Sequence, residues 1–113
     1  MHALLHTAAF EKAVKALSAE EVDMALQMIA RDPGCGDVIP GTGGVRKIRI
    51  AASGRGKRGG GRVIYFWFDE DNPIYLLFAY PKNQRDDLSV ARRNAMKKLT
   101  TILKAEMRDR RRR

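Results

Sequence analysis

The hydrophobic positions of this chain change their period from one segment to the next. Residues 2–7 (HALLHT) form a short apolar run that predicts a first strand. In residues 8–17, Phe10, Val14 and Leu17 are spaced by four and three residues. This spacing places the three side chains on one face of a helix.

A second helical segment begins at Ser18. Glu21 follows three residues later, and the pair is typical of a capping box, in which each side chain bonds a free amide at the helix start. The apolar stripe of this segment comprises Val22, Leu26 and Ile29. The helix should end before Pro33, since proline disfavours the helical conformation in the residue before it. We therefore expect two antiparallel helices joined by a short turn.

Residues 45–52 (VRKIRIAA) follow a turn-rich stretch and alternate with the two-residue period of a strand. One face of this strand carries Val45, Lys47 and Arg49, and the other carries Arg46, Ile48 and Ile50. The pattern predicts a strand with cationic side chains on its surface.

Two further segments, 62–68 (RVIYFWF) and 74–80 (IYLLFAY), are apolar on both faces and rich in β-branched and aromatic residues. Both properties are typical of buried central strands. The residues between them (DEDNP) form a turn. Because the connections are too short for crossover helices, we predict that the three strands form an antiparallel meander.

The C-terminal part predicts a helix capped by Ser89. Its apolar side comprises Ala95, Met96, Leu99, Ile102, Leu103 and Met107. This side is expected to pack against the sheet or the helix pair. Together the segments predict one α+β domain over residues 1–107, followed by a basic tail, 108–113, that is too charged to pack and is expected to be disordered.

Charge is unevenly distributed along the 113 residues. The net charge is +9, and residues 46–62 contribute +7 of it with seven basic residues and no acidic one. The tail RDRRRR contributes +4, which leaves −2 for the remainder. A nearly neutral body with two cationic segments predicts a polyanionic partner such as nucleic acid, an acidic protein or anionic lipid.

Further features of the sequence indicate the class of protein and its cellular compartment. The hydrophobic fraction of 44% fits a globular protein, and no apolar run approaches the roughly 20 residues of a membrane helix. The N-terminus lacks the pattern of a signal peptide. Cys35 is the single cysteine, so no internal disulfide can form, and it is expected to pack as a small apolar residue. These features favour the reducing cytoplasm.

The segment 54–62 (GRGKRGGGR) consists of glycines and cations. It matches G-x-G-x-x-G, but a strand follows where a dinucleotide site needs a helix, and neither a kinase nor a Walker A loop fits the surrounding sequence. Two interpretations stay open. The segment is either a solvated hairpin whose charge aids solubility, or a cradle in which glycines let a phosphate backbone approach while Lys57, Arg58 and Arg62 neutralise it. Arg62 opens a strand and so has a rigid base for bidentate phosphate binding.

Three blocks of the sequence resemble the RelE/HigB family of bacterial toxins, in particular its HigB-like branch: GDVIPGTGGVRKIRIA, GKRGGGRVIY and IYLLFAYPKNQRDDLS. The resemblance extends from about Phe10 to Leu103. It implies a RelE-like α+β fold, with an antiparallel sheet packed by two N-terminal helices and a C-terminal helix. It also implies a ribosome-dependent endoribonuclease of messenger RNA that needs no cofactor and is restrained by an antitoxin, often a helix-turn-helix protein.

The resemblance also implies site residues. Those expected to act in catalysis are Lys47, Lys57, Arg62, Tyr80 and Lys82, and those expected to bind RNA are Arg46, Arg49, Arg55, Arg58 and Asn83. One departure concerns the start of the last helix. Better-known members carry a tyrosine there, whereas this chain has Asp87, Leu88 and Ser89, so Tyr80 would have to substitute for that tyrosine in proton transfer.

The chemistry implied is attack of the RNA 2′-hydroxyl on the neighbouring phosphorus. The sequence offers no His, Cys or carboxylate set with metal-ligand spacing. Arg62 and Lys82 would meet the negative charge that develops on phosphate. A lysine crowded by cations, either Lys47 or Lys57, is a candidate general base. Two rivals remain: a non-catalytic basic module that binds nucleic acid or the ribosome, and a structural subunit whose arginine tail docks on an acidic partner.

Overall fold

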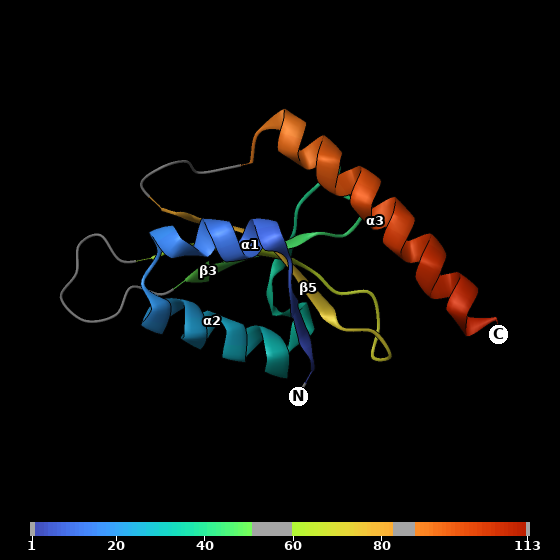
Figure 1. The fold of residues 1–113 in the computed structure, drawn as a ribbon, viewed down its shortest axis with the longest axis horizontal. Helices are drawn as coiled ribbons and strands as arrows, with labels where there is room; N and C mark the ends of the chain where they lie inside the picture. The colour runs from blue at the N-terminus through green and yellow to red at the C-terminus, as the bar shows by residue number, and fades with distance from the viewer. Residues whose placement is uncertain (1, 51–59, 83–87, 113) are drawn as a thin grey trace.

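The computed structural model describes residues 2–50, 60–82 and 88–112, which form one five-stranded mixed sheet between two layers of helix (Figure 1). Helices α1 and α2 cover one face and α3 covers part of the other. The strands are β1 (Leu4–His6), β2 (Asp37–Val38), β3 (Arg46–Ile50), β4 (Gly61–Phe66) and β5 (Ile74–Pro81). The helices are α1 (Ala8–Ala13), α2 (Ala19–Arg31) and α3 (Val90–Arg111), with single 3-10 turns at Val14–Ala16 and Pro33–Cys35.

The predicted meander is confirmed for β3, β4 and β5, which pair antiparallel in sequence order. The structure adds a strand at each edge, so the order is β1-β5-β4-β3-β2. The predicted N-terminal strand is β1, and it pairs parallel to β5, with Leu4 opposite Ile74. The short strand β2 lies in the stretch predicted to be rich in turns and pairs antiparallel with β3.

Alternation along the strands divides the interior into two clusters. One lies under α1 and α2 and comprises Phe10, Val22, Ala25, Leu26, Ile29, Ile48, Ile50, Val63, Tyr65, Ile74, Leu76 and Ala79. The other lies under α3 and comprises Ile39, Val45, Ile64, Phe66, Leu77, Tyr80, Leu88, Met96, Leu103 and Met107. Strands β4 and β5 supply both clusters, which explains why the sequence is apolar on both of their faces.

A β-bulge interrupts the pairing of β4 and β5. Ile64 pairs with Phe78 and the next residue, Tyr65, pairs with Leu76, so Leu77 is the extra residue. Leu77 and Phe78 consequently both pack on the side that α3 covers. Bulges of this kind re-aim side chains, and here the bulge brings an aromatic ring to the α3 side of the sheet.

The helix ends follow the sequence signals. The Ser18 hydroxyl accepts from the Glu21 amide, as a capping residue does, and Thr7 caps α1 in the same way. The Glu21 carboxylate also accepts a hydrogen bond from Gly60 N (3.0 Å), although Glu21 was expected to serve only the helix cap. This buried contact ties α2 to the residue just before β4.

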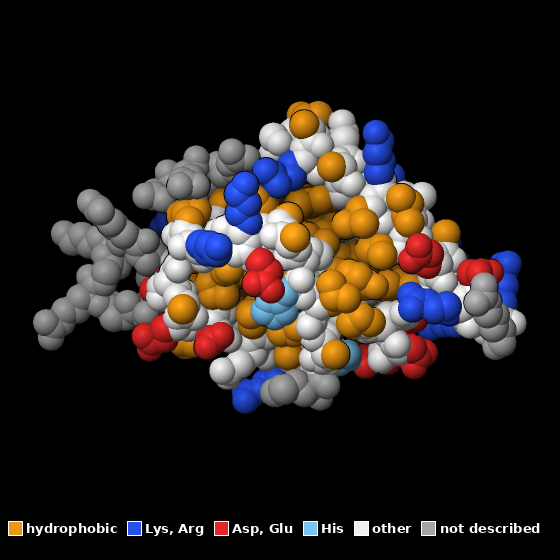
Figure 2. All heavy atoms as spheres, viewed as in Figure 1, with side chains coloured by type: hydrophobic (Ala, Val, Ile, Leu, Met, Phe, Trp, Pro, Cys, Tyr) orange, Lys and Arg blue, Asp and Glu red, His pale blue; other side chains and the backbone are white. Residues whose placement is uncertain are grey.

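The buried side of α3 differs from the predicted one. Met96, Leu103 and Met107 are buried as expected, but Thr100 is also fully buried, whereas Leu99 is 37% and Ile102 57% exposed. The reason is a hydrogen bond from the Thr100 hydroxyl to the Thr42 carbonyl (2.8 Å), which sets the rotation of the helix. Gly43 permits this contact, because a Cβ there would overlap the Thr100 hydroxyl. Figure 2 shows that hydrophobic side chains are exposed on the surface between α1 and α3.

Helix α3 continues through residues 108–111, which were expected to fray. Arg111 forms an ion pair with Asp69 in the turn between β4 and β5 (2.5 Å). An acidic turn therefore meets the basic end of α3. No helix in the described part of the chain is long and apolar enough to cross a membrane.

We predict that Thr100→Val lowers the free energy of unfolding by about 1–3 kcal/mol, because it leaves the Thr42 carbonyl without its buried donor. The matched control is Thr101→Val, since Thr101 is exposed and bonds only within its own helix, to the Lys97 carbonyl. Urea denaturation of both variants measures the difference. Equal destabilisation of the two variants would contradict the assigned role of Thr100.

Candidate nucleic-acid interface

Strand register gathers basic residues on the part of the α3-side face that adjoins β2. Arg49 of β3 lies opposite Arg62 of β4, which in turn lies opposite Tyr80 of β5. Directly opposite residues of antiparallel strands point to the same face, so the three side chains form one row across the sheet.

The neighbouring row contains four residues from four strands. Asp37 lies opposite Lys47, Lys47 opposite Ile64, and Ile64 opposite Phe78. The two rows place Lys47 and Arg49, two residues apart on β3, beside Arg62. The predicted alternation of β3 is thus confirmed, with Lys47 and Arg49 on the face away from α1 and α2.

These rows border a hollow of about 200 Å³, which is lined by Cys35, Asp37, Lys47, Ile48, Arg49 and Arg62. Three cations and one carboxylate face it, so its formal charge is positive. Lys47 and Arg62 are half-buried and Arg49 is exposed. A shared concave surface with fixed cations suits a phosphate group or chain.

Glycines determine how Arg62 enters the sheet. Gly60 has a φ of +98°, which favours glycine, and a Cβ at Gly61 would lie 2.5 Å from the Tyr80 carbonyl. Glu21 holds the Gly60 amide, and Arg62 itself donates from Nη1 to the Gly61 carbonyl (2.9 Å). The base of the Arg62 side chain is therefore fixed by a close backbone contact and by a buried carboxylate.

Arg46 was expected to bind RNA, but it lies on the opposite face of the sheet, across from Tyr65. Its Nη1 donates to the carbonyls of Gly36 (2.7 Å) and Gly34 (3.3 Å). The structure does not bring Arg46 together with Lys47, Arg49 and Arg62 but uses it to hold the turn that precedes β2.

Tyr80 and Lys82 occupy the end of β5 beside Arg62. Tyr80 is only 2% exposed and packs in the α3-side cluster, so its hydroxyl is covered, whereas Lys82 is exposed directly after β5. Next to Tyr80, the Phe78 ring carries the Arg92 guanidinium 3.8 Å above its centroid. Arg92 thereby brings a cation from α3 to the same face of the sheet.

A family model described as the RelE toxin of the RelE/RelB toxin–antitoxin system matches residues 3–111. The chain belongs to the RelE toxin family. The match covers nearly every residue and agrees with the observed α+β fold. Membership of this family also implies a cognate antitoxin as partner.

Four expected site residues of this RelE-family toxin, Lys57, Arg55, Arg58 and Asn83, lie outside the described residues. Sequence reasoning had assigned no role in the site to Asp37 and Cys35, which line the hollow, or to Arg92, which lies over the Phe78 ring on the same face of the sheet. Asp37 lies in a segment that was interpreted as turns, and only its pairing with Lys47 reveals its position. Among the residues that the structure describes, no three His, Cys, Asp or Glu side chains gather as metal ligands.

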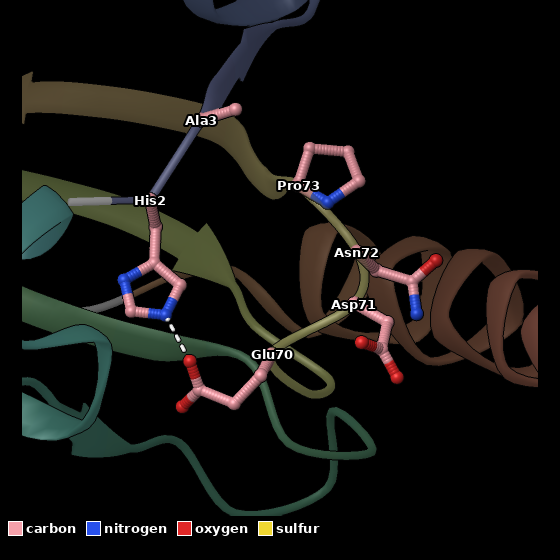
Figure 3. Close-up of a pocket in the computed structure, with 6 residues that line it drawn as sticks. All are labelled: His2, Ala3, Glu70, Asp71, Asn72 and Pro73. Carbon is pink, nitrogen blue, oxygen red and sulfur yellow. Dashed lines mark hydrogen bonds and ion pairs between the residues drawn. The ribbon is translucent and has the colours of Figure 1, made fainter.

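A larger hollow, of about 530 Å³, lies at the opposite end of β5 and is lined by His2, Ala3, Glu70, Asp71, Asn72 and Pro73 (Figure 3). Its acidic residues would repel a polyanion, so the toxin's basic hollow is the better nucleic-acid site despite its smaller volume. His2 Nε2 lies 2.6 Å from Glu70 Oε2, and Nδ1 lies 3.1 Å from the Ala30 carbonyl. The hydrogen bond to Glu70, and then that to Ala30, raise the pKa of His2 above its usual 6.5.

Because this pKa is raised on folding, the His2–Glu70 pair stabilises the toxin at low pH, and the effect disappears as pH rises through the pKa of folded His2. We predict that Glu70→Gln lowers the urea midpoint at about pH 5.5, where His2 is charged, and has little effect at about pH 9. Asp71→Asn is the control, as Asp71 lines the same hollow without bonding His2. A Glu70→Gln effect that does not change with pH would refute the ion pair.

Proposed function

We propose that this RelE-family toxin is a ribosome-dependent endoribonuclease that cleaves messenger RNA and so inhibits translation. The observation that supports the proposal is the hollow shared by Lys47, Arg49 and Arg62 on one rigid sheet face, with Lys82 exposed at the adjacent strand end. A ribose-phosphate chain laid along this face would meet cations from β3 and β4 and, just beyond β5, Lys82.

Cleavage is proposed to proceed by attack of the 2′-hydroxyl on the adjacent phosphorus. Arg62 offers a planar guanidinium on a fixed base, which suits the equatorial oxygens of the developing phosphorane. Lys82, which directly follows β5, would stabilise the same negative charge. Proton transfer was assigned from the sequence to Lys47, Lys57 or Tyr80, and the burial of Tyr80 disfavours the last.

Dependence on the ribosome follows from the modest acid–base chemistry of the site. Holding the 2′-oxygen, phosphorus and leaving oxygen in line contributes up to roughly 7–11 kcal/mol to a barrier. A cationic hollow binds phosphate but does not by itself impose that geometry. The ribosome, which fixes the path of a message, is proposed to supply it.

The proposal extends to the branch of the RelE family, the antitoxin and the cellular compartment. The blocks GTGG-x-RK and Y-x-KN support the assignment of the toxin to the HigB-like branch, and its antitoxin is proposed to be a helix-turn-helix protein that alone contacts operator DNA. The proposed compartment is the cytoplasm, where messages are translated.

A second candidate is a non-catalytic basic module of the same fold that binds the ribosome or nucleic acid. The burial of Tyr80 favours this candidate, because it removes the aromatic hydroxyl that would best transfer a proton. The same cationic hollow would serve binding without cleavage.

We predict that Arg62→Ala slows cleavage of messages on translating ribosomes by at least about tenfold, equivalent to about 1.4 kcal/mol of barrier. Arg31→Ala is the matched control, because Arg31 is exposed at the end of α2 on the other side of the sheet. Mapping of mRNA 5′ ends measures cleavage, and circular dichroism verifies the fold of each variant.

Each outcome separates the two candidates. Cut messages that become intact with Arg62→Ala but not with Arg31→Ala support the nuclease. Messages that stay intact with the wild-type toxin, while it binds ribosomes, favour the binding module. Equal cleavage by wild type and Arg62→Ala removes Arg62 from the site.

A further inference from the structure

The basic hollow contains one carboxylate among its lining residues, that of Asp37. We propose that Asp37 is the general base that takes the proton of the RNA 2′-hydroxyl, an inference that rests on the proposed nuclease function. Asp37 belongs to β2 and is the direct partner of Lys47 on β3, so the two side chains share the face that carries Arg49 and Arg62.

The position of Asp37 is held from the residue before it. The Gly36 amide donates to the Tyr65 hydroxyl (2.8 Å), and that hydroxyl donates to the Pro33 carbonyl (2.8 Å). The Gly36 carbonyl accepts from Arg46 Nη1 (2.7 Å). Both polar groups of the Gly36 backbone are therefore bonded, and one of the two partners, Tyr65, is fully buried.

Gly36 itself must remain without a side chain, because a Cβ there would lie 2.7 Å from the Tyr65 hydroxyl and 2.9 Å from the Lys47 carbonyl. A tyrosine, an arginine and a glycine thus cooperate to fix one short turn and the edge strand that follows it. General bases need such a fixed support, since proton transfer requires hydrogen-bond distance to the substrate.

The chemistry of a carboxylate suits the step better than that of the neighbouring lysine. A carboxylate is ordinarily ionised at neutral pH and can only accept, whereas a lysine must first lose a proton before it can act as a base. The ribose hydroxyl is the donor that distinguishes RNA from DNA. With phosphates bound to Lys47, Arg49 and Arg62, Asp37 lies at the edge of the same hollow, where it can accept from that hydroxyl.

In the proposed step, the 2′-O–H bond breaks and its proton passes to the Asp37 carboxylate. The 2′-oxygen forms a bond to the adjacent phosphorus, the bond from phosphorus to the 5′-oxygen breaks, and the leaving oxygen takes a proton from water. The products are a 2′,3′-cyclic phosphate and a 5′-hydroxyl. Asp37 then returns its proton to solvent.

The test compares Asp37→Asn, Asp37→Glu and the control Asp23→Asn in single-turnover cleavage of a defined message on programmed ribosomes. Asp23 is exposed on α2, across the sheet from the hollow. We expect Asp37→Asn to slow cleavage at least about tenfold at neutral pH. Asp37→Glu should restore part of the rate, and Asp23→Asn should match the wild type.

Binding of a message with a single 2′-deoxy nucleotide at the cleavage position is the second readout. Asp37→Asn should bind it at least as tightly as the wild type, because the change removes a negative charge from a phosphate site.

An Asp37→Asn variant that cleaves at the wild-type rate, or that loses binding and cleavage together, overturns the assignment. If Arg62→Ala is inactive while Asp37→Asn is fully active, the base assignment fails and the nuclease stands. A wild type that cuts no message overturns both.

Discussion

The antiparallel register of β3, β4 and β5 is the constraint on which the rest of the molecule depends. It places Arg49, Arg62 and Tyr80 in one row and Lys47, Ile64 and Phe78 in the next. A shift by one residue along β3 would exchange Lys47 and Arg49 with the buried Ile48 and Ile50. The burial of those two isoleucines under α1 and α2 therefore holds Lys47 and Arg49 on the opposite face.

The hollow is bordered by segments that other elements hold in place. Glu21 of α2 holds the Gly60 amide where the chain enters β4, and Tyr65 and Arg46 hold the turn that enters β2. Glu21, Tyr65 and Arg46 all lie on the side of the sheet that α1 and α2 cover. The backbone segments that they hold lead to the residues of the cationic hollow on the other side. The cationic surface of this RelE-family toxin is thus rigid because its supports lie in the opposite half of the structure.

Local patterns predicted a large part of the fold and some of the site. The three meander strands, the capped helices and the separation of Lys47 and Arg49 from the isoleucines followed from periodicity alone, because that signal is repeated over several residues. The predicted face of α3 was partly wrong. The hydrogen bond from Thr100 to the Thr42 carbonyl turns the polar Thr100 inward, and the neighbouring Leu99 is exposed instead. Arg46 was assigned to RNA for its charge, yet backbone carbonyls engage its guanidinium.

What the sequence by itself determined is the alternation of the strands, the helix starts at Ser18 and Ser89, and the presence of a basic, glycine-rich segment before Arg62. Only the tertiary structure decided which distant residues meet: β1 parallel to β5, Asp37 beside Lys47, Glu21 on Gly60, and the covering of Tyr80. The physical reason is that hydrophobic period is a local property of a chain. Pairing between residues far apart in sequence depends on the closure of loops and on the burial of polar groups, which no short stretch encodes.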